Sequence, residues 1–184
     1  KVLDIGANIG QFAITLNKFN SFNTKIFCFE PNPVAYKLLE KNTKNYKNIS
    51  TYNLGIGQNK KSSLYYLPNK SATGSLILKN SQNKEPAKTV ETTIQLTNEI
   101  RKITAINEFD LIKIDVEGYE FEVIKNISIK TKYLFIEISG NRQRNYRHSE
   151  IFKLIENKWG QFDIIYQDTF QKEENNFEVL LKFT

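Results

Sequence analysis

The sequence predicts an α/β fold: a mostly parallel sheet with helices on both faces and an antiparallel hairpin at the C-terminal end. Short apolar runs alternate with segments of helical periodicity through most of the chain, which is the order of strand-helix units in a parallel sheet. The last two apolar runs, residues 162–166 and 177–183, have no helical pattern between them and therefore predict the hairpin. With 184 residues, 40% of them hydrophobic, the chain suits a single domain over residues 1–184.

The first third of the chain predicts three strands and two helices. Residues 2–5 and 25–29 are apolar runs of strand length, and residues 49–54 are a third candidate. After the second run, Asn32 suits a helix N-cap and Pro33 the first helical position. The preceding helix is predicted from apolar residues at helical spacing: Phe12, Ala13, Leu16 and Phe19.

The middle of the chain departs from this order before strand-helix alternation resumes. Residues 62–67 and 89–96 alternate apolar and polar side chains, which predicts two exposed strands, and residues 68–88 predict a loop between them. Residues 111–116 and 133–138 are again buried-strand runs. Helical spacing predicts one helix between these strands and one after them that ends at Gly160: Phe121, Ile124 and Ile127, then Ile151, Phe152, Ile155 and Trp159.

A glycine-containing segment, residues 4–10, links the first strand to the first helix. Gly6, Asn8 and Gly10 lie where the chain turns sharply, and glycine adopts positive φ freely while asparagine tolerates it. Small side chains there also let a ligand lie against the backbone at the C-terminal edge of the sheet. The segment lacks the G-x-G-x-x-G spacing of dinucleotide-binding folds, which favours a ligand without phosphates.

Two carboxylates flank this turn. Glu30 ends the second strand about twenty residues after Gly10, the spacing at which a carboxylate accepts hydrogen bonds from both hydroxyls of a ribose. Asp4 ends the first strand, where its charge would favour the cationic amino group and sulfonium of S-adenosylmethionine. The alternative is that both carboxylates only cap neighbouring helices.

Three motifs in this order resemble the FkbM family of S-adenosylmethionine-dependent methyltransferases: residues 2–10 (VLDIGANIG), 29–33 (FEPNP) and 112–120 (IKIDVEGYE). The resemblance implies a Rossmann-like class I methyltransferase fold, S-adenosyl-L-methionine as cofactor, and O-methylation of a hydroxyl on a sugar, glycan or small natural product. It also implies that the first two motifs bind the cofactor, through Asp4, Gly6, Asn8, Gly10, Glu30 and Pro31.

Methyl transfer to a hydroxyl requires alignment of the oxygen and a group that accepts its proton. Asp115 follows a buried strand and precedes Gly118, which places it at the C-terminal end of a central strand beside the predicted cofactor. Glu117 follows on the same turn, and Glu137 lies at the same edge one strand further along. These three carboxylates are the catalytic candidates, and the alternative for Asp115 is a helix cap.

Other reactive side chains carry no predicted function. Cys28, the only cysteine, lies between two phenylalanines and is expected to be a core thiol. His148, the only histidine, is expected to be structural. Asp115 with Glu117 or Glu137 would suit a divalent cation, but no set of histidines and carboxylates supports one, so no metal is predicted.

The net charge of +6 comes mainly from lysines spread along the chain, with a local arginine cluster at Arg142, Arg144 and Arg147. A solvated surface is therefore favoured over a nucleic-acid patch, and the expected partner is a small-molecule or glycan acceptor. A nucleic-acid methyltransferase and a non-catalytic module of the same fold remain the alternatives.

The N-terminal residues and the hydropathy of the chain predict where the chain begins and in which compartment the protein lies. The sequence has no methionine and Lys1 leads directly into an apolar strand, which predicts a chain truncated at its N-terminus. No apolar run approaches the roughly 20 residues that span a bilayer, and no signal peptide is recognisable. We therefore expect a cytoplasmic protein without a membrane span. The sequence predicts no oligomeric state.

Overall fold

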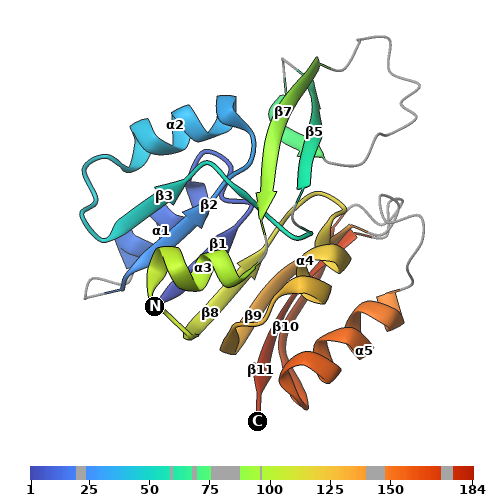
Figure 1. Cartoon of the computed structure of the whole chain (residues 1–184). Coiled ribbons are helices and arrows are strands. Elements are labelled where there is room, and N and C mark those ends of the chain that lie inside the picture. The colour runs from blue at the N-terminus through green and yellow to red at the C-terminus, as the bar shows by residue number, and fades with distance from the viewer. Residues whose placement is uncertain are drawn as a thin grey trace.

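The computed structural model describes residues 1–19, 24–58, 60–67, 70–75, 88–95, 97–139, 148–170 and 176–184. Its main feature is a seven-stranded sheet with the order β10-β11-β9-β8-β1-β2-β3 (Figure 1). The strands from β9 to β3 are parallel, whereas β11 is antiparallel to β9 and β10 to β11. The predicted fold class and C-terminal hairpin are therefore confirmed. The strands are β1 Val2–Ile5, β2 Ile26–Phe29, β3 Ile49–Tyr52, β8 Glu108–Ile114, β9 Lys130–Ser139, β10 Phe162–Phe170 and β11 Asn176–Phe183.

Helices cover both faces of this sheet, as predicted. Successive residues of a strand point to opposite faces, and here they belong to two separate cores. Val2 and Cys28 pack with α1 and α2, whereas Leu3 and Phe27 pack with α3, α4 and α5. The helices are α1 Gln11–Phe19, α2 Pro33–Thr43, α3 Thr97–Thr104, α4 Glu120–Asn126 and α5 His148–Trp159.

The ends of α2 and α5 follow their predicted signals. Asn32 is the N-cap of α2, where its side-chain oxygen accepts a hydrogen bond from the backbone N of Val34 at 3.0 Å, and Pro33 is the first helical residue. Gly160 follows α5 with φ of +96°, a conformation that glycine commonly adopts after a helix. Both helix ends are therefore encoded by residues next to them in the chain.

A second, four-stranded sheet with the order β4-β7-β5-β6 projects beyond the large sheet (Figure 1). It consists of β4 Gly55–Ile56, β5 Lys60–Leu67, β6 Lys70–Ser75 and β7 Lys88–Gln95. β5 and β7 confirm the two predicted strands and pair antiparallel. The predicted loop over residues 68–88 is wrong where β6 lies. β6 pairs with β5 and has a mostly polar sequence, so alternation of apolar residues could not reveal it.

Two further elements lie where the sequence predicts nothing. β4 has two residues and is held by parallel pairing with β7. In α3, Ile100 and Ile103 join the apolar core, and two apolar residues are too few to produce a clear helical period. Among the residues that the structure describes, no helix has the length and apolar character needed to cross a membrane.

Candidate active site

Three loops meet at the C-terminal ends of the central strands β1, β2 and β8. Ile5, Phe29 and Ile114 end these strands in register. Backbone hydrogen bonds continue beyond them, from Gly6 N to Phe29 O and from Asp115 N to Ile5 O, both at 3.0 Å. The residues that follow the three strands therefore lie together at the edge where open α/β sheets bind ligands.

The turn after β1 adopts the predicted backbone conformation. φ is +82° at Gly6, +49° at Asn8 and +91° at Gly10. A Cβ atom at Gly6 would lie 1.8 Å from the carbonyl oxygen of Asp115. A Cβ atom at Gly10 would lie 2.8 Å from Cδ1 of Leu39. The missing side chains thus make room for neighbouring protein atoms, and contact between this turn and a cofactor stays a prediction.

Glu30 connects the glycine turn to the start of α2. Its Oε2 accepts a hydrogen bond from Asn8 N at 2.8 Å, and its Oε1 accepts one from Asn32 N at 2.7 Å. Glu30 is only 7% exposed, and burial raises its pKa to about 7 although both hydrogen bonds and Lys113 oppose the rise. A carboxylate offers about four acceptor positions, so the geometry still permits the predicted hydrogen bonds to ribose hydroxyls.

Pro31, the next predicted cofactor residue, anchors the second sheet to this loop. Its carbonyl oxygen accepts hydrogen bonds from Thr92 Oγ1 at 2.7 Å and from Asn53 Nδ2 at 3.3 Å. Asn53 Nδ2 also donates to the carbonyl oxygen of Glu30 at 2.8 Å. The loop that carries Glu30 is thereby held by two other parts of the chain. A direct cofactor contact of Pro31 stays a prediction.

Asp4 is fully buried and faces Lys113, its register partner on β8. Lys113 Nζ lies 3.3 Å from Asp4 Oδ1 and 3.2 Å from Asp115 Oδ2. The Asp4 oxygens have this ion pair but make no well-directed hydrogen bond among the described residues. Burial raises the pKa of Asp4, and Lys113 opposes the rise. An internal ion pair is therefore the partner that the structure gives Asp4, and direct contact with a cationic cofactor group stays a prediction.

Lys113 is a site residue that the sequence patterns above do not identify. It is 6% exposed, and its Nζ also donates to the carbonyl oxygen of Gly6 at 3.0 Å. The available signal was a lysine inside an otherwise apolar strand, since a buried cation needs a partner. Asp115 lies two residues from Lys113 in the sequence, but the buried partner Asp4 could not be read from it, because Asp4 lies on the distant strand β1.

Asp115 does not cap a helix. The helix that follows is α4, and its N-cap is Tyr119. Gly118 N donates to Glu120 Oε1 and Tyr119 N to Val116 O, so neither amide is capped by Asp115. The alternative role of Asp115 as a cap is therefore wrong. Its side chain is 33% exposed and its Oδ2 is paired with Lys113, so the carboxylate lies at the boundary between the ion pair and solvent.

Glu137 lies beside Asp115, because Ile136 and Ile114 are register partners on β9 and β8. Burial raises the pKa of Glu137 to about 8, and the charges of Asp115, Glu120 and Glu178 add to the rise. Asp115 and Glu137 are thus brought together as predicted. The catalytic role of both residues stays a prediction.

Glu117 lies in the turn between β8 and α4, and Glu120 is the first residue of α4. Glu117 has φ of +53°, a left-handed conformation that is uncommon for a residue with a side chain. Glu120 is fully buried and accepts a hydrogen bond from Gly118 N at 2.8 Å. Glu120 therefore stabilises this turn, while a catalytic role of Glu117 stays a prediction.

The remaining reactive groups are placed as follows. Cys28 is fully buried in the core, and burial raises its pKa. His148 begins α5 and packs edge-on against Phe177 with ring centroids 4.8 Å apart, and burial lowers its pKa. Within the described part of the chain, no group of three or more histidine, cysteine or acidic side chains could hold a metal ion. Arg142, Arg144 and Arg147 lie outside the described residues.

Comparison with known proteins agrees with this architecture. Residues 4–162 match the Methyltransferase FkbM domain family. "Methyltransferase 1" of Beauveria bassiana (strain ARSEF 2860) is 23% identical over 144 residues, and the match covers 68% of this chain and 57% of that protein. The chain therefore spans less than two thirds of the length of this relative.

Two solved structures share the fold. Methyltransferase FkbM from Methylobacillus flagellatus KT superposes with a TM-score of 0.63 at 14% identity, covering 100% of this chain and 43% of that one. Fibrillarin from Aeropyrum pernix, solved with natively bound S-adenosyl-L-methionine, has a TM-score of 0.60 at 11% identity, covering 98% of this chain and 65% of that one. The family match includes all three motifs apart from the first two residues of the first motif, and the chain belongs to the FkbM methyltransferase domain family.

Proposed function

We propose that this chain is an S-adenosylmethionine-dependent methyltransferase that methylates a hydroxyl oxygen of a sugar, glycan or small natural product, within a single domain spanning residues 1–184. The main observation is that the glycine turn, Glu30 and Asp115 converge at one sheet edge in a member of the FkbM methyltransferase family. We call the glycine turn (residues 6–10) and Glu30 the cofactor side, and Asp115 and Glu137 the acceptor side.

The residues of the cofactor side suit S-adenosylmethionine. Glu30 retains acceptor positions for ribose hydroxyls. Asp4 and Asp115 share one ammonium, so the group of Asp4, Lys113 and Asp115 has a net negative charge when both carboxylates are ionised. That charge would favour a cationic ligand. When bound, the cofactor supplies an electrophilic methyl group.

The acceptor side offers two carboxyl groups in different environments. Asp115 is exposed on one side and paired with Lys113 on the other, which suits it to orient the acceptor hydroxyl and take its proton. Glu137, with a pKa of about 8, holds a proton at neutral pH and can donate a hydrogen bond to the acceptor. Neighbouring groups that differ in this way can serve as base and hydrogen-bond donor.

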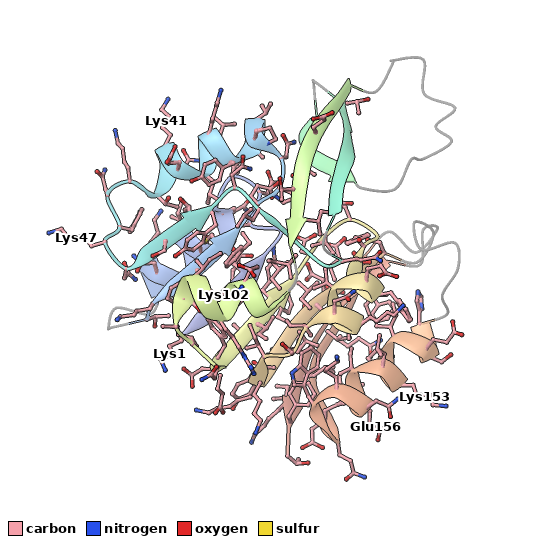
Figure 2. The ribbon with its side chains drawn as sticks, in the orientation of Figure 1. Lys1, Lys41, Lys47, Lys102, Lys153 and Glu156 are labelled. Atoms are coloured by element: carbon pink, nitrogen blue, oxygen red, sulfur yellow. The ribbon has the colours of Figure 1, made fainter. Side chains whose placement is uncertain are left out.

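Charges near the acceptor side argue against a nucleic-acid substrate. Glu137 pairs in register with Glu178 on β11, and Glu178 pairs with Asp168 on β10. The ionised members of this row would repel a phosphate backbone. Figure 2 shows the labelled lysines extending from different parts of the molecule, such as Lys41 on α2 and Lys153 on α5. A neutral acceptor such as a sugar or polyol fits this edge better.

Isothermal titration calorimetry tests the cofactor half of this proposal. We expect S-adenosylhomocysteine and S-adenosylmethionine to bind and NAD not to bind, because the glycine turn lacks the dinucleotide spacing. Tighter binding of NAD than of S-adenosylhomocysteine would contradict the proposal.

A screen tests the acceptor half. Sugars, polyols and short oligonucleotides are incubated with the chain and S-adenosylmethionine, and S-adenosylhomocysteine release is measured. We expect turnover with a hydroxylated neutral compound. Turnover with oligonucleotides alone would favour the nucleic-acid alternative, and cofactor binding without turnover on any acceptor would favour the non-catalytic module. A cytoplasmic location remains a prediction.

A further inference from the structure

Lys113 is a buried cation whose ammonium contacts three acceptors from different parts of the site. Its Nζ lies 3.0 Å from Gly6 O, 3.3 Å from Asp4 Oδ1 and 3.2 Å from Asp115 Oδ2. One hydrogen bond, to Gly6 O, and two ion-pair contacts therefore bring a backbone oxygen and two carboxylates to the same ammonium. The ring of Phe12 on α1 lies over the same ammonium, with its centroid 5.7 Å from Nζ.

The two parts that Lys113 connects are also in backbone contact. A Cβ atom at Gly6 would lie 1.8 Å from Asp115 O, and Asp115 N donates to Ile5 O at 3.0 Å. These contacts therefore fix the backbone position of Asp115 but do not determine its side-chain rotamer. The ion pair between Lys113 Nζ and Asp115 Oδ2, at 3.2 Å, favours one orientation of the carboxylate.

Lys113 also acts electrostatically on carboxyl groups from several elements. It lowers the pKa of Asp4 on β1, Glu30 after β2, Glu137 on β9 and Glu178 on β11. Burial favours the neutral amine, but Asp4 and Asp115 outweigh it and raise the pKa of Lys113 above its ordinary value. The residue is therefore a permanent cation that serves the cofactor side and the acceptor side together.

We propose that Lys113 is a positioning residue: it holds Asp115 by Oδ2, leaves Oδ1 to the acceptor hydroxyl, and fixes the first carbonyl of the glycine turn relative to that carboxylate. This role rests on the proposed methyltransferase function. A buried ion pair is by itself weak evidence for a contribution to stability. The position of this ion pair between the cofactor side and the acceptor side instead supports a role in arranging the site. Lys113 touches no reacting atom in this arrangement and acts through Asp115.

The test separates positioning from simple neutralisation of buried charge. Lys113→Met removes the cation and leaves Asp4 without its ion-pair partner, so this variant is expected to lose stability. The double variant Lys113→Met/Asp4→Asn also removes the buried charge that would be left behind. Lys132→Met is the matched control, because Lys132 lies on a neighbouring strand and forms an exposed ion pair with Asp110 at 2.7 Å.

We expect the double variant to regain most of the parental melting temperature but to keep kcat reduced by at least about tenfold, with a smaller change in the KM for cofactor. Its pH-rate profile should move to higher pH, because the remaining carboxyl groups lose their shared cation. Lys132→Met should match the parent in melting temperature, kcat and profile.

Recovery of kcat and of the pH-rate profile together with the melting temperature would overturn the proposal, because Lys113 would then only neutralise Asp4. Amide hydrogen exchange of the ligand-free proteins provides a readout that needs no acceptor. The double variant should exchange faster than the parent at residues 6–10 and 115–118, and unchanged exchange there would also overturn the proposal. Failure of the parent to bind S-adenosylhomocysteine would instead contradict the proposed function.

Discussion

On the cofactor side, Asn8 and Glu30 are joined by a hydrogen bond between a backbone amide and a carboxylate, and Gly6 contacts the neighbouring backbone directly. On the acceptor side, Asp115 and Glu137 are neighbours because β8 pairs with β9. The first arrangement depends on backbone conformations that only certain residues adopt, so it leaves a motif in the sequence. Asp115 also lies in a motif, residues 112–120, but its proximity to Glu137 depends on strand order and on the charges that strand order brings together. Substitutions should therefore affect the two sides differently.

Gly6→Ala should produce the largest effect, a loss of folding stability. The added Cβ would lie 1.8 Å from Asp115 O at a residue with φ of +82°. Relieving this clash would require one of the two backbone segments to shift. We expect a loss of about 3 kcal/mol or more in the free energy of unfolding, measured by urea denaturation.

Gly160→Ala is the matched control for this substitution. Gly160 has φ of +96°, but a Cβ there would meet nothing within 4 Å, so only the conformational cost of about 1 kcal/mol applies. Equal losses in the two variants would show that the close contact between the glycine turn and Asp115 is not important for stability.

Asp115→Asn should affect turnover and leave cofactor binding nearly intact. Asparagine keeps the shape of the side chain but cannot accept the hydroxyl proton as a carboxylate does. Once the screen has identified an acceptor, we expect kcat to fall by about 10²-fold or more relative to the parent. Affinity for S-adenosylhomocysteine should stay within roughly a factor of three of the parental value. Asp110→Asn, at an exposed ion pair, should leave kcat unchanged. Parental turnover of Asp115→Asn would remove Asp115 as the base and make Glu117 and Glu137 the next candidates.

Glu30→Ala should weaken cofactor binding by about 1.5–3 kcal/mol through loss of a charge-assisted contact to the ribose. The structure adds a second effect, because Asn8 N and Asn32 N lose their acceptor and the folded state should also lose stability. Glu30→Gln retains one acceptor oxygen and serves as the comparison. Calorimetry and thermal unfolding are needed together. Unweakened cofactor binding in a folded Glu30→Ala variant would show that the ribose assignment is incorrect.

Stability should fall as pH rises from about 4.5 to about 8. The pKa of Glu30 is raised to about 7 and that of Glu137 to about 8, so the folded state holds protons that the unfolded state releases. The associated stability is complete below the unfolded pKa and is lost as the folded carboxyls ionise.

Glu137→Gln should remove its share of this loss, about 2 kcal/mol after allowance for partial solvent screening. Denaturation midpoints measured at pH 5 and pH 8 would therefore differ less in the variant than in the parent. The control Glu156→Gln, at an exposed position on α5 (Figure 2), should retain the parental difference. An unchanged difference in Glu137→Gln would mean that Glu137 ionises freely in the folded protein.

The sequence by itself determined the features that depend on neighbouring residues. The positive φ values at Gly6, Asn8 and Gly10 and the N-cap at Asn32 follow from residue types that tolerate or favour those local conformations. Alternation of apolar runs with helical periods predicted the parallel sheet, since each strand and helix must bury one face.

Tertiary structure decided the features that depend on residues far apart in the chain. The ion pair of Lys113 with Asp4 and the raised pKa of Glu137 arise only when β1, β8 and β9 lie side by side. Asp115, by contrast, lies two residues from Lys113 in the chain. β6 forms because β5 offers it a pairing edge, and its own sequence has little pattern. Burial and charge proximity between distant segments are properties of the assembled fold, so no local pattern can encode that Asp4 will share the ammonium of Lys113.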